Sequence, residues 1–336
     1  MTRPGPTKTR KPTAARRDNR VDTIDPPAGT LPGIVVRSHG LWHEVVLHDR
    51  ADPVIATLRG SLKRHRRGTD PVAVGDRVWL TPLPGNEGVI DFIEPRTRTL
   101  GRIARHTRDV EQVILANPDQ VLFVFAYRQP EPHLRMLDRF IILAELQEIP
   151  IRIVVSKIDL DETGGENART LFADHARAFP VHFVSTHTGE GVDQLRDVIA
   201  GKVSAVAGPS GVGKSSLLNL LDPAPNREVA EVSTATGKGR HTTVGARLHT
   251  IGNNTFVADT PGMRALTMVA VPGSELDWSY RELRPYLGLC RYPDCTHVHE
   301  PGCAVRDAVE RGEIAPSRYA SYVLLRTGDE VGSGPN

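Results

Sequence analysis

The chain has 336 residues, 39% hydrophobic and 24% charged, an ordinary composition for a globular protein with room for two or three domains. Its formal net charge is only +2, so the overall charge does not indicate a nucleic-acid partner. The sequence lacks a run of about 18 apolar residues, which argues against a membrane-spanning helix. The first residues also lack the apolar core of a signal peptide. We therefore expect a cytoplasmic protein with no membrane partner.

Residues 1–30 are expected to form a disordered basic tail, because they contain little that could be buried. The first 20 residues include a single acid, Asp18, and seven basic residues: Arg3, Lys8, Arg10, Lys11, Arg16, Arg17 and Arg20.

Residues 31–97 are predicted to form a β-barrel domain with an OB-fold. Five short runs rich in β-branched residues, separated by turn formers, predict strands at 33–37, 42–48, 54–58, 76–81 and 88–93. Between the third and fourth runs, residues 59–67 carry five positive charges. This loop is either an ordinary solvated loop or, as we favour, a contact to a polynucleotide backbone.

Residues 98–275 are predicted to form an α/β domain with a mostly parallel sheet. Apolar runs predict strands at 121–126, 151–155, 181–184 and 203–207, and helical periodicity predicts helices at 133–148, 166–178, 192–200 and 214–221. A hairpin of 246–251 with 255–258 is expected to complete the sheet. Residues 276–330 are predicted as a small, mostly α-helical, metal-binding domain with a closing helix at 317–326.

The clearest functional motif runs from Gly208 to Ser215 and fits the phosphate-binding loop. Its glycines let backbone N–H groups curl around a phosphate, at the N-terminus of the following helix. Lys214 can reach the β- and γ-phosphates, and the Ser215 hydroxyl can ligate Mg²⁺.

A second motif, Asp259-Thr-Pro-Gly262, follows a predicted strand 45 residues after Lys214. The carboxylate can hold Mg²⁺ through water, and the Gly262 N–H can sense the γ-phosphate. The glycine-rich segment 237–243 lies between the two motifs and offers the hydroxyls of Thr242 and Thr243 as a switch loop.

The segment Ser156-Lys157-Ile158-Asp159 follows a predicted strand, where GTPases usually have Asn-Lys-x-Asp. The Asp159 carboxylate can accept two hydrogen bonds from guanine that adenine does not offer, and the stem of Lys157 can cover the base. We expect Ser156, in place of Asn, to weaken a bridge to the phosphate loop. Ser185-Thr186 is a weaker candidate for supporting the base from its other side.

The order of these motifs is the decisive observation. The base-reading segments precede the phosphate loop, whereas ordinary GTPases have the phosphate loop first. This order predicts a circularly permuted GTPase, with the usual termini joined near residues 201–202 and the chain opened after Gly262.

All three cysteines of the chain lie within the 14 residues from Cys290 to Cys303, a spacing typical of a structural zinc site. Cys290, Cys295 and Cys303 would supply three thiolates, and either His297 or His299 could supply the fourth ligand.

Together the barrel, the permuted GTPase motifs and the Cys-x4-Cys-x-His-x5-Cys spacing resemble the bacterial ribosome small subunit-dependent GTPase A family. The resemblance covers residues 31–325, and its most specific matches are 208–216, 239–243, 259–262 and the Cys/His spacing. It implies GTP hydrolysis stimulated by the small ribosomal subunit, in late maturation of that subunit, and it favours His297 as the fourth zinc ligand. The departures from the family pattern are Ser156 and Val244, which stand in place of Asn and Thr.

We accordingly expect a monomeric GTP hydrolase with GTP or GDP, Mg²⁺, one structural zinc ion, the small ribosomal subunit and its rRNA as ligands and partners. The alternatives are a nucleotide-gated RNA-binding scaffold with negligible hydrolysis and a P-loop ATPase, which Asp159 argues against. We expect Lys214 and Thr243 to take part in catalysis. Met263 occupies the place where many GTPases have a water-orienting Gln, so we expect His241 to position the water instead. The expected nucleotide-binding residues are Ser156, Lys157, Ile158, Asp159, Ser185, Thr186, Gly208, Pro209, Ser210, Gly211, Val212, Gly213, Lys214, Ser215, Ser216, Thr242, Asp259 and Gly262.

Overall fold

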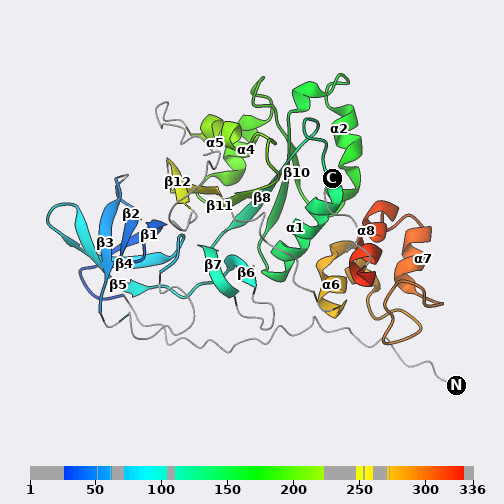
Figure 1. Ribbon diagram of the computed structural model, residues 1–336, viewed down its shortest axis with the longest axis horizontal. Coiled ribbons are helices and arrows are strands. Elements are labelled where there is room, and N and C mark those ends of the chain that lie inside the picture. Colours follow the sequence, from blue (N-terminus) through cyan, green and yellow to red (C-terminus); the bar gives the residue numbers. More distant parts are fainter. Residues whose placement is uncertain are drawn as a thin grey trace, which may run out of the picture.

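The computed structural model describes residues 26–50, 52–60, 62, 72–103, 110–222, 247–252, 254–259, 271 and 273–328. These residues form a barrel, a central α/β sheet and a helical module, side by side along the long axis of the molecule (Figure 1). Among them, no helix is both long and apolar enough to cross a membrane.

The N-terminal part is a closed barrel with the strand order β1-β2-β3-β5-β4, in which β1 also pairs with β4. Alternate residues of its strands point inward, so that Val35, Val45, Leu80 and Ile90 fill the interior. The five-stranded barrel predicted from the sequence is confirmed. Its strands are β1 (Leu31–Ser38), β2 (Trp42–Leu47), β3 (Val54–Leu58), β4 (Arg77–Leu83) and β5 (Glu87–Ile93).

A two-stranded ribbon that the sequence patterns did not predict, β6 (Thr99–Ile103) with β7 (Val110–Ala116), connects the barrel to the sheet. The junction depends on close backbone approach at Gly75, where a Cβ would lie 2.1 Å from the carbonyl oxygen of Ala116. Beside it, the buried carboxylate of Asp76 pairs with Arg96 at 2.7 Å. The barrel is therefore held against the β6–β7 ribbon by close backbone contact and by a buried ion pair.

The central sheet has the order β10-β9-β8-β11-β13-β12, and all neighbouring pairs are parallel except β12 with β13. Every residue of the central strand β8 is buried, as expected for a strand covered on both faces. The strands are β8 (Gln120–Ala126), β9 (Ile151–Ser156), β10 (Val181–Phe183), β11 (Val203–Ala207), β12 (Arg247–Gly252) and β13 (Thr255–Asp259).

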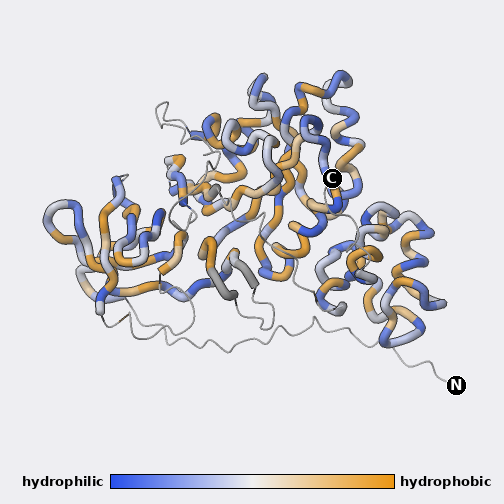
Figure 2. The backbone as a smooth tube through the Cα atoms, viewed as in Figure 1, coloured by the Kyte–Doolittle hydropathy of each residue, from blue (hydrophilic) through white to orange (hydrophobic). Residues whose placement is uncertain are grey.

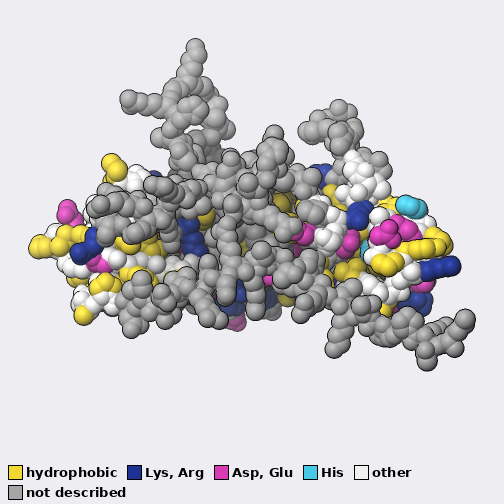
Figure 3. Space-filling view, turned by 90° about the horizontal axis from the view of Figure 1, so that it is seen from below, with side chains coloured by type: hydrophobic (Ala, Val, Ile, Leu, Met, Phe, Trp, Pro, Cys, Tyr) yellow, Lys and Arg dark blue, Asp and Glu magenta, His cyan; other side chains and the backbone are white. Residues whose placement is uncertain are grey.

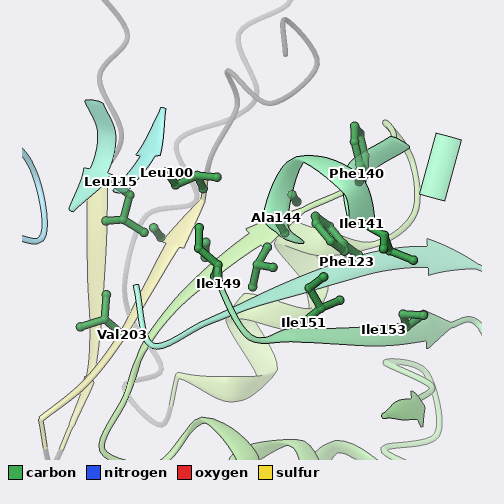
Figure 4. Close-up of a cluster of buried hydrophobic side chains, with 14 of the residues drawn as sticks. Leu100, Leu115, Phe123, Phe140, Ile141, Ala144, Ile149, Ile151, Ile153 and Val203 are labelled. Carbon is green, nitrogen blue, oxygen red and sulfur yellow. The ribbon is translucent and has the colours of Figure 1, made fainter. Parts of the chain in front are cut away.

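Helices cover both faces of this sheet. On one face α1 (Leu134–Leu146) contributes Phe140, Ile141 and Ala144 to a core with Phe123 and Ile153 (Figure 4). On the other face lie α4 (Val192–Ile199) and α5 (Lys214–Leu221). Figure 2 shows the hydrophobic residues concentrated along the strands and on the inner sides of these helices.

The helix predicted over 166–178 differs from the structure, which has two short helices, α2 (Glu166–Leu171) and α3 (Ala173–Ala176). The chain departs from helical geometry at Phe172, whose side chain is completely buried in the sheet core. Burial of this ring outweighs the local preference for one continuous helix.

The C-terminal module comprises α6 (Gly273–Ser279), the 3-10 helix η4 (Arg281–Tyr286), α7 (Ala304–Glu310) and α8 (Pro316–Thr327). Its core includes Leu276, Tyr280 and Tyr322 together with Ile142 of α1, so the module packs directly on the sheet domain.

Buried charges fasten this module to α1. Arg318, only 2% exposed, pairs with Asp138 of α1 and with Glu282 at 2.6 Å. The imidazole of His175 also contacts Asp138, at 2.8 Å. Burial alone would raise the pKa of Asp138, but the hydrogen bond from His175 and the charge of Arg318 outweigh it and hold that pKa below its usual value.

We predict that Asp138→Ala strongly destabilises the protein, because it leaves a buried guanidinium with one carboxylate partner fewer. Breaking a buried ion pair costs about 3–5 kcal/mol, which urea unfolding would measure. Asp193→Ala is the control, since Asp193 pairs with Arg196 while its side chain is 91% exposed, and it should cost no more than about 1 kcal/mol. Equal losses in the two variants would contradict a structural role for the buried network.

Candidate nucleotide and metal sites

The carboxyl ends of the parallel strands form one edge of the central sheet, where ligands of open α/β sheets bind. The phosphate-loop motif follows β11 and leads into α5. The base-reading segment begins at Ser156, the last residue of β9, and Ser185 follows β10. Asp259 ends β13 and is in register with Val206 of β11. The chain order is permuted, yet the sheet brings these segments to the same edge.

The phosphate loop has the close backbone packing that its glycines allow. A Cβ on Gly208 would lie 2.0 Å from the carbonyl oxygen of Val124, so only glycine fits there. Gly213 has φ +88° immediately before α5 begins at Lys214. The Lys214 ammonium donates to the carbonyl oxygens of Gly208 at 3.0 Å and Pro209 at 2.6 Å, and it therefore lies over the loop. The hydroxyl-bearing residues Ser215 and Ser216 are exposed in the first turn of α5.

The base-reading segment is held by contacts from two neighbouring loops. Ser185, which is buried, donates its hydroxyl hydrogen to the Asp159 carboxylate at 2.5 Å, and its oxygen accepts from the backbone of His187 and Thr188. The Lys157 ammonium donates to the carbonyl oxygen of Gln129. Ser185 thus orients the carboxylate that is predicted to read guanine.

Ser156 connects the base-reading segment to the phosphate loop directly. Its hydroxyl donates to the carbonyl oxygen of Val212 at 2.6 Å, and the carbonyl oxygen of Phe125 lies 3.3 Å away. The sequence led us to expect a weakened bridge with Ser in place of Asn. The structure shows that the shorter side chain still makes one, because β9 and the loop approach closely.

The cysteine and histidine side chains of the C-terminal module converge. One ligand atom from each of Cys290, Cys295, His297 and Cys303 lies within 4.8 Å of the others. The His297 Nδ1 is 3.4 Å from the Cys290 sulfur and 3.5 Å from the Cys303 sulfur, whereas His299 is exposed. Of the two histidines, the structure thus places His297 in the cluster.

The chemistry of this cluster fits a cation. Burial raises the pKa of the Cys295 and Cys303 thiols, so their thiolates would need a nearby positive charge. Three thiols and one imidazole at these separations are the donor set of a closed tetrahedral metal site.

Several predicted site residues lie outside the described part of the chain, namely His241, Thr242, Thr243 and Gly262. Of Asp259 the structure describes the backbone alone, and of the basic loop 59–67 it describes only Arg59, Gly60 and Leu62.

Comparisons with known proteins agree with this architecture. A family model described as RsgA GTPase matches residues 93–269. A protein of Gemmatimonas aurantiaca named small ribosomal subunit biogenesis GTPase RsgA is 46% identical over 298 residues, which cover 88% of this chain and 96% of that protein. The chain belongs to the RsgA GTPase family.

Other members of the RsgA family extend the match. A protein of the same name from Chlorobaculum tepidum is 38% identical, over 88% of this chain and 97% of its own length. Among solved structures, YjeQ from Thermotoga maritima has a TM-score of 0.73 at 33% identity, over 91% of this chain and all of that one. YloQ, described as a circularly permuted GTPase, has a TM-score of 0.69 at 26% identity, over 91% of this chain and 97% of that one. The permuted fold and the class of GTP hydrolase predicted from the sequence are confirmed.

Sequence reasoning missed the contact between Lys157 and Gln129, and also Glu300. The Glu300 carboxylate accepts hydrogen bonds from the Thr296 hydroxyl at 2.5 Å and the Thr296 backbone at 2.9 Å, which shapes the turn between two cluster residues. The position of Glu300, an acid shortly after a Cys-x-His segment, could have indicated its role in the sequence. The contact at Gln129 uses a backbone carbonyl, which every residue has, so no sequence pattern could have indicated it.

We predict that Ser156→Ala weakens guanine nucleotide binding, because the Val212 carbonyl loses its donor and the two loops are no longer tied. Loss of one hydrogen bond, about 0.5–1.5 kcal/mol, corresponds to a Kd increase of roughly two- to twelvefold in a titration with GDP. Ser204→Ala is the control, because Ser204 is equally buried but bonds Gln120 instead. An unchanged Kd for Ser156→Ala would show that the bridge is dispensable.

We also predict that Asp159→Asn exchanges guanine for xanthine specificity, because an amide can donate to the C2 carbonyl of xanthine. Losing two hydrogen bonds to a charged group, about 3–6 kcal/mol, should weaken GTP binding by roughly two to four orders of magnitude. Asp161→Asn is the control, since the Asp161 carboxylate accepts from the Thr163 hydroxyl and from the backbone N–H of Ala168 in α2. Retained GTP preference in Asp159→Asn would refute the assignment of the base-reading residue.

Proposed function

We propose that the chain hydrolyses GTP at the carboxyl edge of its central sheet and acts in this way in the late maturation of the small ribosomal subunit. The observation that carries the proposal is the hydrogen bond from Ser156 to Val212, which joins a base-reading segment to a phosphate loop in permuted order. Relatives named small ribosomal subunit biogenesis GTPases match this chain over nearly their whole length.

In the proposed site each residue has a separate task. Asp159, oriented by Ser185, accepts from the guanine edge, and the stem of Lys157 covers the base. Residues 208–213 and the start of α5 donate backbone N–H groups to the phosphates, and Lys214 leaves its carbonyl partners for the β- and γ-phosphates. Ser215, Thr243 and Asp259 would hold Mg²⁺, which neutralises the charge developing on the transferred phosphoryl group. Thr242 and the Gly262 N–H would sense the γ-phosphate.

We further propose rRNA as the partner of the barrel. At the β1–β2 turn, His39 stacks on Trp42 with ring centroids 3.7 Å apart, and the neighbouring Leu41 is 77% exposed. Exposed rings are stacking platforms for unpaired bases, and the first loop of OB-type barrels is a usual binding position. Apolar side chains project beside basic ones at this end of the molecule (Figure 3).

The Cys3His cluster is proposed to bind one structural zinc ion, since its four donors leave no position for a substrate. The zinc module would form a second rRNA contact, with Leu289 and Tyr292 exposed and Arg291 over the Tyr292 ring. We take the domains as 31–97, 98–275 and 276–330, after a basic tail at 1–30, and the protein as a cytoplasmic monomer.

Turnover of GTP with and without purified small ribosomal subunits tests the proposal. A catalytic group supplied in trans is worth about 10³–10⁵ in kcat among P-loop GTPases, so a subunit that supplies such a group should raise turnover by about that factor. Negligible hydrolysis in both conditions would favour the nucleotide-gated RNA-binding scaffold, and equal competition by ATP would favour an ATPase.

Two variants sharpen this assay. Lys214→Ala should abolish stimulated turnover, because the proposed role of Lys214 is to bind the β- and γ-phosphates. His241→Ala should lower single-turnover hydrolysis by about 10²–10⁴-fold with little change in GTP affinity, if His241 positions the water. A His241→Ala rate near that of the wild type would transfer that role to another residue or to the rRNA.

A further inference from the structure

His297 presents its two ring nitrogens to different chemical groups. Nδ1 faces the sulfurs of Cys290 and Cys303, at 3.4 and 3.5 Å. Nε2 points the other way and lies 4.0 Å from the Oδ2 atom of Asp277, in helix α6. A histidine that ligates a metal through one nitrogen commonly donates the other N–H to a carboxylate. The ring therefore has a candidate partner on each side.

Asp277 is itself held in place by the last helix. The Tyr322 hydroxyl bridges the Asp277 Oδ1 atom, at 2.7 Å, and the carbonyl oxygen of Thr296, at 2.8 Å. The Arg326 guanidinium lies 3.5 Å from the same Oδ1 atom. These contacts occupy Oδ1 and leave Oδ2 facing His297.

The backbone of His297 also has an unusual conformation, which other residues maintain. His297 has φ +64°, a left-handed conformation that costs about 1–2 kcal/mol for a residue with a Cβ. The Tyr319 hydroxyl donates to the His297 carbonyl at 2.7 Å, and Glu300 accepts from the backbone of Thr296 and Val298 on either side. A strained residue held by its surroundings is typical of a site that needs one side-chain direction.

We propose that Asp277 is a positioning residue of the metal site. Its carboxylate accepts the Nε2–H of His297, which fixes the neutral tautomer with the Nδ1 lone pair directed at the metal ion. This inference rests on the proposed zinc site and extends it, because it adds a carboxylate from a helix outside the segment 290–303. Metal binding then also depends on the packing of α6 against α8.

The zinc affinity of the full-length protein, measured by competition with a chromophoric chelator, tests this role. Losing such a carboxylate should weaken zinc binding by about 10–100-fold in Asp277→Asn. Tyr322→Phe keeps the ring and removes the hydroxyl that holds Asp277, so it should also weaken zinc binding. Asp294→Asn is the control for loss of one negative charge near the cluster, because Asp294 is exposed and adjacent to Cys295. The zinc affinity of this variant should match that of the wild type.

Nitrogen-15 NMR of the histidine rings in the zinc-loaded wild-type protein provides a readout that does not depend on a variant folding. We expect His297 of the wild-type protein to bind zinc through Nδ1 and to retain a slowly exchanging Nε2 proton. A wild-type protein that binds no zinc would overturn the metal site and this inference together. Stoichiometric zinc with ligation through Nε2, or with unchanged affinity in Asp277→Asn, would overturn the inference alone.

Discussion

The alignment of parallel strands in the central sheet is the constraint on which the rest of the structure depends. Because β9, β8, β11 and β13 run in the same direction, the segments that follow them emerge at one edge, whatever their order along the chain. Ser156 ends β9 and bonds Val212 of the loop after β11, so the segment predicted to read the base and the phosphate-loop motif are physically joined. Circular permutation preserves the site for this reason: the geometry follows from strand neighbours and not from sequence order.

Helix α1 performs a second joining role. Leu137 and Ile141 pack in the sheet core, whereas Ile142 belongs to the core of the helical module. On the side of the module, Asp138 pairs with Arg318, and Glu145 pairs with Arg281 and Arg284. Just before the helix, the carbonyl of Gln129 receives the Lys157 ammonium. Helix α1 therefore connects the central sheet to the module that carries the Cys3His cluster.

The sequence predicted what depends on local periodicity and close motifs. Alternating runs predicted the barrel strands. The spacing of Cys290, Cys295 and Cys303 predicted a cluster fit for a metal ion, and the family resemblance favoured His297 over His299 as its fourth member. The sequence patterns did not predict structure that depends on tertiary packing. The predicted helix is interrupted at Phe172, whose ring is buried, and the β6–β7 ribbon forms where the sequence shows no clear periodicity. The approach of Asp277 to His297 joins residues of different elements, which single-sequence patterns do not relate.

The central claim is that a single site at the sheet edge binds guanine nucleotide through segments in permuted order. A crystal structure of the full-length protein with a non-hydrolysable GTP analogue and Mg²⁺ tests it most directly. The guanine base should lie between Lys157 and the loop of Ser185, with its N1–H and 2-amino group on Asp159, and the triphosphate should lie within residues 208–215. A base bound away from Asp159, or phosphates outside that loop, would contradict the claim.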